Sequence, residues 1–243
     1  MNVTFQRIQI LAILLLLLAC PMAARASQPI TVVYGHGRAW LMKLTLDGQN
    51  QLEKGDLAAA QRSLDTVIEA DPTFYPAYYV RARVFLNQRK FEEAFQDDNE
   101  ALRKDSTFAE AALLRAQTNY HLGRYSESLE EIDHVISIRP RQDAFARAYY
   151  DRAWFRLNCP DQSYRNDQQA LKDATAACKL IGWKDEDMID TLAAAYAEVG
   201  DFDSAVRYEE KALAIKGMKT SDFERLQAHL DSFKQRRPCT AVR

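Results

Sequence analysis

The amino-acid sequence predicts an all-α fold assembled from repeated pairs of helices. Three observations lead to this prediction. Only 8 glycines and 7 prolines occur among 243 residues, so few positions interrupt a helix. Small residues alternate with large apolar ones, as in LAAAYAEVGDFDSAV (192–206), which allows two helix backbones to pack closely around a glycine turn. The arrangement also recurs at a fixed spacing, because a short helix pair needs neighbours to bury its apolar face.

Three columns of residues recur with a spacing of 34. They are a turn position (Gly55, Arg89, Gly123), a small position five residues later (Ala60, Ala94, Ser128) and a stop position (Pro72, Ser106, Pro140). A helix–turn–helix period of 34 residues that ends near proline is the pattern of the tetratricopeptide repeat. The chain therefore resembles the tetratricopeptide-repeat superfamily over nearly all of its length after the N-terminal segment.

This resemblance implies a right-handed α-solenoid of about five units, each with a helix A and a helix B. The units would span 41–74, 75–108, 109–142, 146–185 and 186–219. The small eighth position of the family falls on Gly48, Ala82, Ala116, Ala153 and Ala193. The small twentieth position falls on Ala60, Ala94, Ser128, Ala174 and Ala205, and the large seventeenth position on Leu57, Phe91, Tyr125, Leu171 and Phe202. We interpret all of these as packing residues.

Residues 220–243 are expected to form a capping helix and a tail. Phe223, Leu226, Leu230 and Phe233 share one face of the predicted helix, and the opposite face is polar. A helix of this kind closes a stack of repeats.

The fourth unit is longer than its neighbours by nine residues between Ala153 and Leu171, and the excess falls in NCPDQSYRNDQQ (158–169). The segment resembles a variant found in exported or envelope repeat proteins of bacteria. One interpretation is a longer turn with an extended helix B, since solenoids tolerate insertions between helices. The other is a binding loop built on Asp161, Tyr164 and Arg165.

Cys159 and Cys178 are expected not to form a disulfide. The first ends one helix of the fourth hairpin and the second lies about three turns into the next, roughly 18 Å away along the axis. A disulfide needs Cα atoms within about 7 Å. Cys178 is then a buried packing residue and Cys159 a loop thiol.

Residues 1–26 read as a signal peptide, followed by a lead-in at 27–40. The apolar run IQILAILLLLLAC (8–20) is too short to span a bilayer, and Ala24 and Ala26 fit the small-residue cleavage pattern. The expected location is therefore periplasmic or secreted, with no membrane span after cleavage. The alternatives are a lipoprotein anchored at Cys20, within LLAC, and an uncleaved anchor.

The sequence offers no catalytic, cofactor or metal motif, so we expect no enzyme, no cofactor and no metal site. His36, His121, His134 and His229 have no other ligand at zinc-site spacing. The net charge of −2 gives no basic surface for nucleic acid. The carboxylate pairs Asp97–Asp98 and Glu209–Glu210 are interpreted as solvated helix faces.

The remaining class of function is binding, and the resemblance to the family indicates which surface would bind a partner. Its A helices line a concave groove with their second, fifth, sixth, ninth, twelfth and thirteenth positions. Carried onto this chain, these give Tyr79, Arg83 and Asn87, then Gln117, Tyr120 and His121, then Tyr150, Asp151, Trp154 and Asn158. The fifth unit would add Asp190 and Ala194. Aromatic rings beside polar side chains suit an extended peptide of a partner protein. For Tyr79 and Tyr120 the alternative is packing between neighbouring A helices.

The two-carboxylate clamp of the chaperone-binding branch is missing, because Thr45 and Gln49 stand where that branch has Lys and Asn. We therefore expect a non-catalytic protein-interaction adaptor of the cell envelope that binds a protein or peptide partner. The alternative is a structural subunit of an envelope assembly that packs through its edges.

Overall fold

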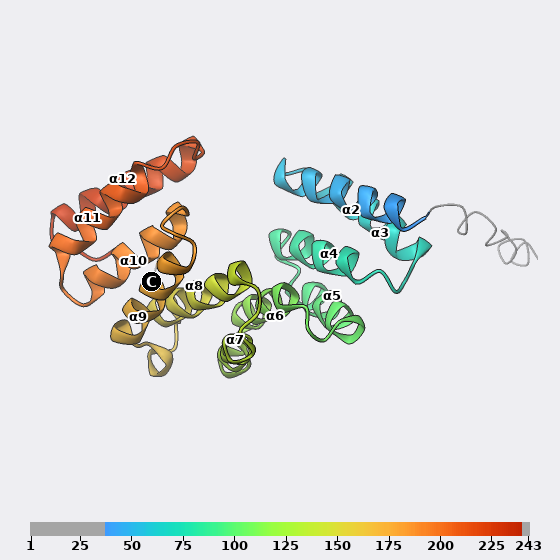
Figure 1. Ribbon diagram of the computed structural model, residues 1–243, viewed down its shortest axis with the longest axis horizontal. Coiled ribbons are helices and arrows are strands. Elements are labelled where there is room, and N and C mark those ends of the chain that lie inside the picture. Colours follow the sequence, from blue (N-terminus) through green and yellow to red (C-terminus); the bar gives the residue numbers. More distant parts are fainter. Residues whose placement is uncertain (1–36, 240–243) are drawn as a thin grey trace, which may run out of the picture. The chain divides into compact units, whose positions relative to one another are not determined.

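A computed structural model of the protein describes residues 37–239 (Figure 1). The predicted signal peptide and residues 27–36 of the lead-in therefore lie outside the described residues. The helices pair as α2 (Arg38–Glu53) with α3 (Leu57–Ala70), α4 (Tyr75–Asn87) with α5 (Phe91–Lys104), α6 (Ala109–His121) with α7 (Tyr125–Ile138), α8 (Gln142–Asn158) with α9 (Asp167–Leu180) and α10 (Glu186–Glu198) with α11 (Phe202–Leu213). A short 3-10 helix, η3 (Gln162–Tyr164), precedes α9, and α12 (Thr220–Lys234) follows the last pair.

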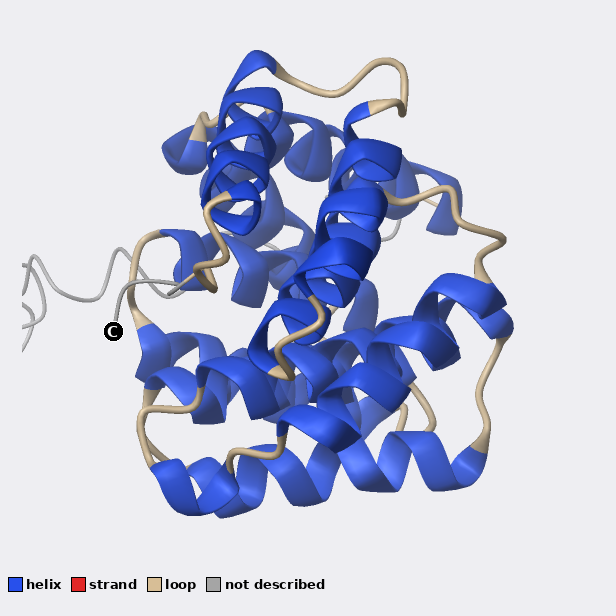
Figure 2. Cartoon of the chain, turned by 90° about the vertical axis from the view of Figure 1, so that its left-hand side faces the viewer, coloured by secondary structure: helices blue, strands red, loops and turns tan. Residues whose placement is uncertain are grey.

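The described residues from Leu41 onward form one compact unit. Within it, the first helix of a pair packs against its own second helix, and the second packs against the first helix of the next pair. The first helices α4, α6, α8 and α10 also contact one another in succession. The described residues contain helices and loops and no strand (Figure 2). The predicted all-α solenoid of five helix pairs with a closing helix is confirmed.

Small residues allow the helices of a pair to approach closely, as predicted. Ala82, Ala116, Ala153 and Ala193 are completely buried. At Gly48 even a methyl group would lie 3.0 Å from Cγ of Leu64, so α2 and α3 meet where glycine alone fits without a shift.

The recurring turn column has a backbone cause. Gly55, Gly123 and Gly200 have φ angles of +80°, +75° and +86°, and Arg89 occupies the same turn with φ +59°. This left-handed conformation costs a glycine little and strains a residue that has a Cβ. At this turn the second pair therefore carries strain that the first, third and fifth pairs avoid.

The fourth pair corrects the predicted register. Helix α8 begins at Gln142, four residues before the predicted unit boundary, and α9 begins at Asp167. The other second helices begin at the seventeenth position, so Asp167 and not Leu171 takes that position here. Three residues later Ala170 is completely buried and takes the twentieth position assigned to Ala174. The connection of eight residues (159–166) exceeds the three of the second pair (88–90) by five rather than nine.

Three arginines, here called the arginine bridges, tie the second, third and fourth pairs to the pair before each of them. Each guanidinium contacts a second helix of its own pair and a second helix of the preceding pair. Arg81 joins Asp65 and Asp97, Arg115 joins Asn99 and Glu131, and Arg152 joins Asp133 and Asp173, at 2.5–2.9 Å.

The prediction that Asp97 and Asp98 lie on a solvated helix face is wrong, because both side chains are buried. Asp97 is 5% exposed and accepts two hydrogen bonds from Arg81. Asp98 is completely buried and lies 3.1 Å from the Thr118 hydroxyl, and its burial raises the pKa of its carboxyl well above the ordinary value. The apolar face of α5 is thus completed by carboxylates that have partners on other helices.

The closing helix buries three of its four predicted apolar residues. Leu226 and Phe233 are completely buried and Leu230 is 5% exposed. Phe223 is 46% exposed, since it lies in the first turn of α12.

Cys159 and Cys178 are both free thiols. Cys159 lies in the connection between α8 and α9, as predicted, and both side chains are completely buried. Cys159 caps the C-terminus of α8, and its carbonyl accepts a hydrogen bond from Arg165 at 2.7 Å.

Candidate functional site

A groove runs across the first helices α4, α6 and α8. Its larger hollow has a volume of about 490 Å³. It is lined by Tyr79, Arg83, Leu86, Asn87, Glu110, Leu113, Leu114, Gln117, Asp143, Ala144, Arg147 and Asp151. A second hollow of about 260 Å³ continues along α6 and α8 and shares Leu113, Gln117, Arg147 and Asp151 with the first. The two hollows therefore form one surface, here called the groove.

Eight of the ten predicted binding residues line the groove. Tyr79, Arg83, Asn87, Gln117 and Asp151 lie in the larger hollow, and Tyr120, Tyr150, Trp154, Gln117 and Asp151 line the second. His121 and Asn158 line neither hollow. The His121 ring stacks on Phe91 with centroids 4.8 Å apart, and the Asn158 carbonyl accepts a hydrogen bond from Tyr120.

The aromatic side chains of the groove differ in how they are held. Tyr79 packs edge-on against Phe108, and the Arg83 guanidinium lies 5.9 Å from the centre of the Tyr79 ring. Tyr120 packs against its neighbours and donates its hydroxyl, so the packing alternative applies to it in part. Trp154 is 37% exposed and offers the groove a large apolar surface.

Charged groups meet at the centre of the groove. Arg147 Nε donates to Asp151 Oδ1 at 2.7 Å, and its guanidinium lies 5.1 Å from the centre of the Tyr150 ring. Burial raises the pKa of Asp151 to about 6 although Arg147 opposes the shift. Burial likewise raises the pKa of Tyr150 to about 12.

The sequence interpretation missed Glu110 and Arg147, which line the larger hollow. Both occupy the second position of their unit as divided above. The family pattern therefore contained the signal, but these two positions were not read from it.

The fifth unit was predicted to extend the groove, and this prediction is wrong for Asp190. Asp190 is 7% exposed because α12 lies over it. Arg225 Nη1 donates to Asp190 Oδ2, and Nδ1 of His229 lies 2.7 Å from Asp190 Oδ1. The capping helix thus occupies the surface that a partner would use.

Glu209 on α11 completes this C-terminal cluster and corrects another prediction. It is completely buried, whereas its neighbour Glu210 is exposed. Burial and the negative charge of Asp190 raise the pKa of Glu209 to about 9. Sequence spacing could not reveal the cluster, because its members come from three helices.

The insertion of the fourth pair is largely packed into the fold. The Tyr164 ring packs edge-on against Phe155 and Tyr125, with centroids 6.0 and 6.1 Å apart. Arg165 is held by the Cys159 carbonyl. Asp161 accepts a hydrogen bond from the Ser163 amide and faces solvent. Two of the three residues of the predicted binding loop are therefore engaged within the protein.

Comparison with known proteins gives a consistent result. A family model described as a tetratricopeptide repeat matches residues 46–107. The human and rat proteins named DnaJ homolog subfamily C member 3 are 25% and 26% identical over 191 residues, which is 74% of this chain and 37% of their length. A Cryptococcus neoformans protein named as a tetratricopeptide repeat and J domain-containing co-chaperone is 29% identical over 93 residues, 38% of this chain and 18% of its own length. The matched region thus spans little more than a third of the length of the human and rat relatives and less than a fifth of the fungal one.

Solved structures show the same fold. A tetratricopeptide-repeat protein of Thermus thermophilus matches with a TM-score of 0.66 at 16% identity, over 80% of this chain and 99% of that one. Pseudomonas aeruginosa pilF matches with a TM-score of 0.61 at 16% identity, over 81% of this chain and 88% of its own. None of the helices in residues 37–239 has the length and apolar character needed to cross a membrane.

Proposed function

Because the chain belongs to the tetratricopeptide-repeat superfamily, we propose that it is a non-catalytic adaptor that binds an extended segment of a partner protein in the groove between α4, α6 and α8. The observation that carries the proposal is the lining of the groove. Aromatic rings stand beside Arg83, which offers hydrogen-bond donors, and beside Asn87 and Gln117, which offer both donors and acceptors. Such a surface can pair with the backbone of a peptide and cover its side chains.

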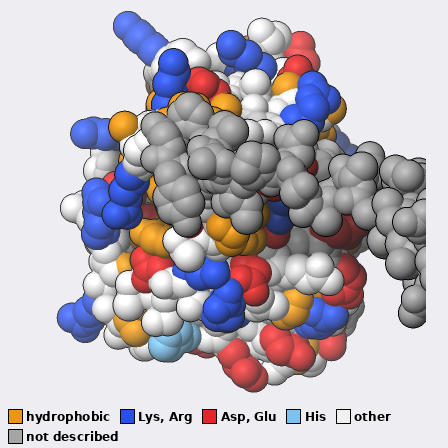
Figure 3. All heavy atoms as spheres, turned by 90° about the vertical axis from the view of Figure 1, so that its right-hand side faces the viewer, with side chains coloured by type: hydrophobic (Ala, Val, Ile, Leu, Met, Phe, Trp, Pro, Cys, Tyr) orange, Lys and Arg blue, Asp and Glu red, His pale blue; other side chains and the backbone are white. Residues whose placement is uncertain are grey.

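The lining is also held in place before a partner arrives. Tyr120 donates its hydroxyl to the Asn158 carbonyl at 3.0 Å, and Arg147 is tied to Asp151. Side chains fixed in this way lose little freedom on binding, which favours affinity. The face drawn in Figure 3 carries both basic and acidic side chains, and the net charge of −2 gives no basic excess that would favour a nucleic acid over a protein partner. The Cryptococcus neoformans relative that is named as a co-chaperone supports a role in protein interaction.

The test is affinity capture of the tagged chain from the envelope fraction of its own organism. Trp154→Ala and Gln117→Ala are the groove variants. Gln96→Ala is the matched control, since Gln96 is also an exposed helical glutamine but lies on α5, outside the groove. We expect both groove variants to lose the partner that the wild type and Gln96→Ala retain. Equal yields of the partner from all four proteins would rule out groove binding.

A structural subunit of an envelope assembly is the second candidate. Met42 and Leu46 on α2 are 58% and 56% exposed and lie four residues apart, so they form an apolar face on the first helix pair. A Met42→Lys/Leu46→Lys variant that breaks up a larger complex in size-exclusion chromatography, while Trp154→Ala leaves it whole, would favour this candidate.

The location of the protein is part of the proposal. The N-terminal segment supports export with cleavage after Ala26, which leaves Ser27 first. N-terminal sequencing of the exported protein tests it. A lipid on Cys20 would place the protein at a membrane surface instead.

A further inference from the structure

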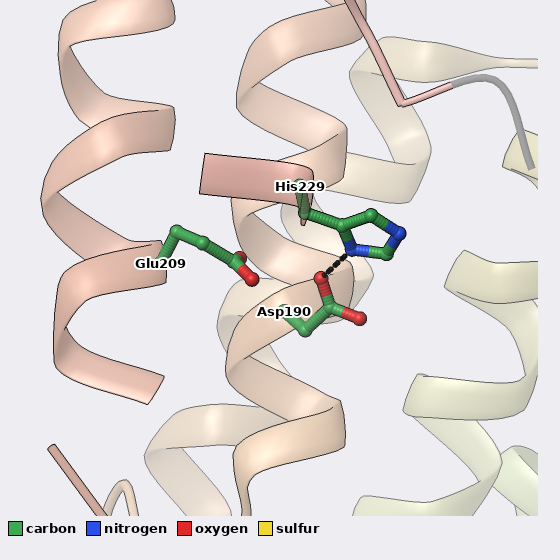
Figure 4. A group of neighbouring side chains, drawn as sticks. All are labelled: Asp190, Glu209 and His229. Atoms are coloured by element: carbon green, nitrogen blue, oxygen red, sulfur yellow. Dashed lines mark hydrogen bonds and ion pairs between the residues drawn. The ribbon is translucent and has the colours of Figure 1, made fainter. Parts of the chain in front are cut away.

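Three ionisable side chains from three helices meet beneath the capping helix. Asp190 comes from α10, Glu209 from α11 and His229 from α12. One potential ligand atom of each lies within 4.8 Å of the others. Figure 4 shows the Glu209 carboxylate directed toward Asp190 and the His229 ring. The groove of the proposed function lies on other helices, so this cluster is independent of it.

Glu209 is the member that the fold alone does not explain. It is completely buried, and neither of its carboxylate oxygens accepts a hydrogen bond from an N–H or hydroxyl donor among the described residues; the polar group beside it is the carboxylate of Asp190. A buried polar group without a partner costs about 1–3 kcal/mol, and a charged one costs more. Such groups are rare in native proteins and indicate a role or a missing ligand.

The donor set has the chemistry of a transition-metal site. Two carboxylate oxygens and an imidazole nitrogen are ligands that Zn²⁺ accepts at about 2.0–2.2 Å. Imidazole selects Zn²⁺, Cu²⁺, Ni²⁺ or Fe²⁺ over Mg²⁺ and Ca²⁺, which prefer oxygen ligands alone. We propose that Asp190, Glu209 and His229 bind a divalent transition-metal ion, with Zn²⁺ as the expected occupant.

The surroundings orient the ligands for this role. Arg225 occupies Asp190 Oδ2, which leaves Oδ1 on the side of His229 and Glu209. Asp187 holds the same guanidinium from the other side at 2.5 Å and balances its charge. Outer partners of this kind fix the geometry of metal ligands. His229 Nδ1 and Asp190 Oδ1 are 2.7 Å apart and must separate to about 3.3 Å to share a tetrahedral ion, a small adjustment for a side chain that is 26% exposed.

An ion at this position joins α10, α11 and α12. The ligands then connect the capping helix to both helices of the last pair. Three protein ligands leave the fourth position of a tetrahedral ion to water, and binding stabilises the C-terminal end of the repeat stack.

The test is zinc binding by the untagged chain after removal of metals with a chelator. Isothermal titration calorimetry at pH 7.5 is expected to show one equivalent of Zn²⁺ bound, and Zn²⁺ is expected to raise the Tm. Glu209→Gln keeps the shape of the side chain and removes a ligand. We expect it to weaken binding by at least about 100-fold, beyond the 10–100-fold typical of changes to outer partners, and to abolish the shift in Tm.

Two controls make the result specific. Glu210→Gln changes the next residue on the same helix, whose side chain is 55% exposed, and is expected to bind zinc as the wild type does. Cys239→Ser tests whether a free thiol is the ligand, because burial raises the pKa of the Cys239 thiol and the nearby charges of Asp190 and Glu209 add to the shift. It too is expected to bind zinc normally.

Three outcomes would overturn the proposal. They are no binding at about 10 μM free Zn²⁺, equal binding by the wild type and Glu209→Gln, and loss of binding in Cys239→Ser alone. Circular dichroism of each variant shows whether it is folded. If Glu209→Gln does not fold, Asp190→Asn and His229→Gln test the other two ligands in the same titration.

Discussion

The indole of Trp154 packs edge-on against the ring of Tyr120, with the ring centroids 5.1 Å apart. The Tyr120 ring is fixed in turn by its hydrogen bond to the Asn158 carbonyl. Trp154 is therefore held in one orientation although 37% of it remains exposed. A large ring that is both fixed and accessible is typical of an interface anchor.

Trp154→Ala should therefore weaken partner binding by about 30-fold or more, which corresponds to about 2 kcal/mol. The same variant should lower the free energy of unfolding by less than about 1.5 kcal/mol. Phe155→Ala is the matched control, since Phe155 is the next residue on α8 and is 2% exposed. The cavity left by Phe155→Ala should lower the free energy of unfolding by about 3–5 kcal/mol. Urea denaturation followed by circular dichroism compares the two, and equal losses would place Trp154 in the core.

Arg81→Met should destabilise the fold by about 3–5 kcal/mol, because the Asp97 side chain is 7% exposed and would lose its cation. The double variant Arg81→Met/Asp97→Leu should recover part of this loss, since it leaves no buried charge at Asp97. Arg103→Met, which removes an exposed ion pair with Glu100, should leave stability unchanged. If the double variant is less stable than Arg81→Met, the bridge does not act through the charge of Asp97.

Arg89→Gly should stabilise the protein by about 0.5–1 kcal/mol, because glycine relieves the positive φ angle at the turn between α4 and α5. Gly123→Ala places a Cβ in the equivalent turn and should cost about 1 kcal/mol. The two changes should move the urea midpoint in opposite directions. A loss of stability in Arg89→Gly would mean that contacts of the arginine side chain outweigh the strain.

Asp151→Asn should alter how stability depends on pH. The pKa of Asp151 is raised from 3.8 to about 6, so between these values the folded protein binds more protons than the unfolded chain. This contribution to stability is fully present below pH 3.8 and is lost as the pH rises through 6. Between pH 4 and pH 7 the free energy of unfolding of Asp151→Asn should therefore rise by about 1–2 kcal/mol relative to that of the wild type. The full shift in pKa would give a larger value, but the Asp151 side chain is 17% exposed and the variant loses the ion pair with Arg147.

Asp161→Asn is the comparison, because hydrogen bonds from Ser163 lower the pKa of Asp161 and reverse the sign of the effect. Urea unfolding at several pH values measures both. A constant difference between Asp151→Asn and the wild type would show that Asp151 does not titrate in this range.

The period of 34 made the fold predictable, because small and aromatic residues mark each helix pair independently. The register of the fourth pair was not predictable from these columns alone. Alanines at 170 and 174 fit the small position equally well, and only Asn166, which caps α9 by accepting from the Gln169 amide, distinguishes them.

The buried charges were harder to predict than the groove. A pair of adjacent carboxylates most often lies on a solvated face, and the partner of Asp97 lies on another helix. A signal was nevertheless present, since Asp65, Asn99 and Asp133 are also separated by 34. The C-terminal cluster had no such spacing, because Asp190 and His229 have no carboxylate or histidine counterpart in the other units, although Glu209 shares the twenty-fourth position of its unit with the buried Asp98.

The arginine bridges end at the fourth helix pair, and this makes the C-terminal end energetically distinct. The seventh position of the fifth unit, which carries arginine in the three preceding units, is the completely buried Leu192. Helices α10–α12 are joined instead by the ionisable cluster around Asp190. Local opening of the chain should therefore follow two regimes, with amide hydrogen exchange in α10–α12 responding to chelators and added zinc, while exchange in α4–α9 stays the same.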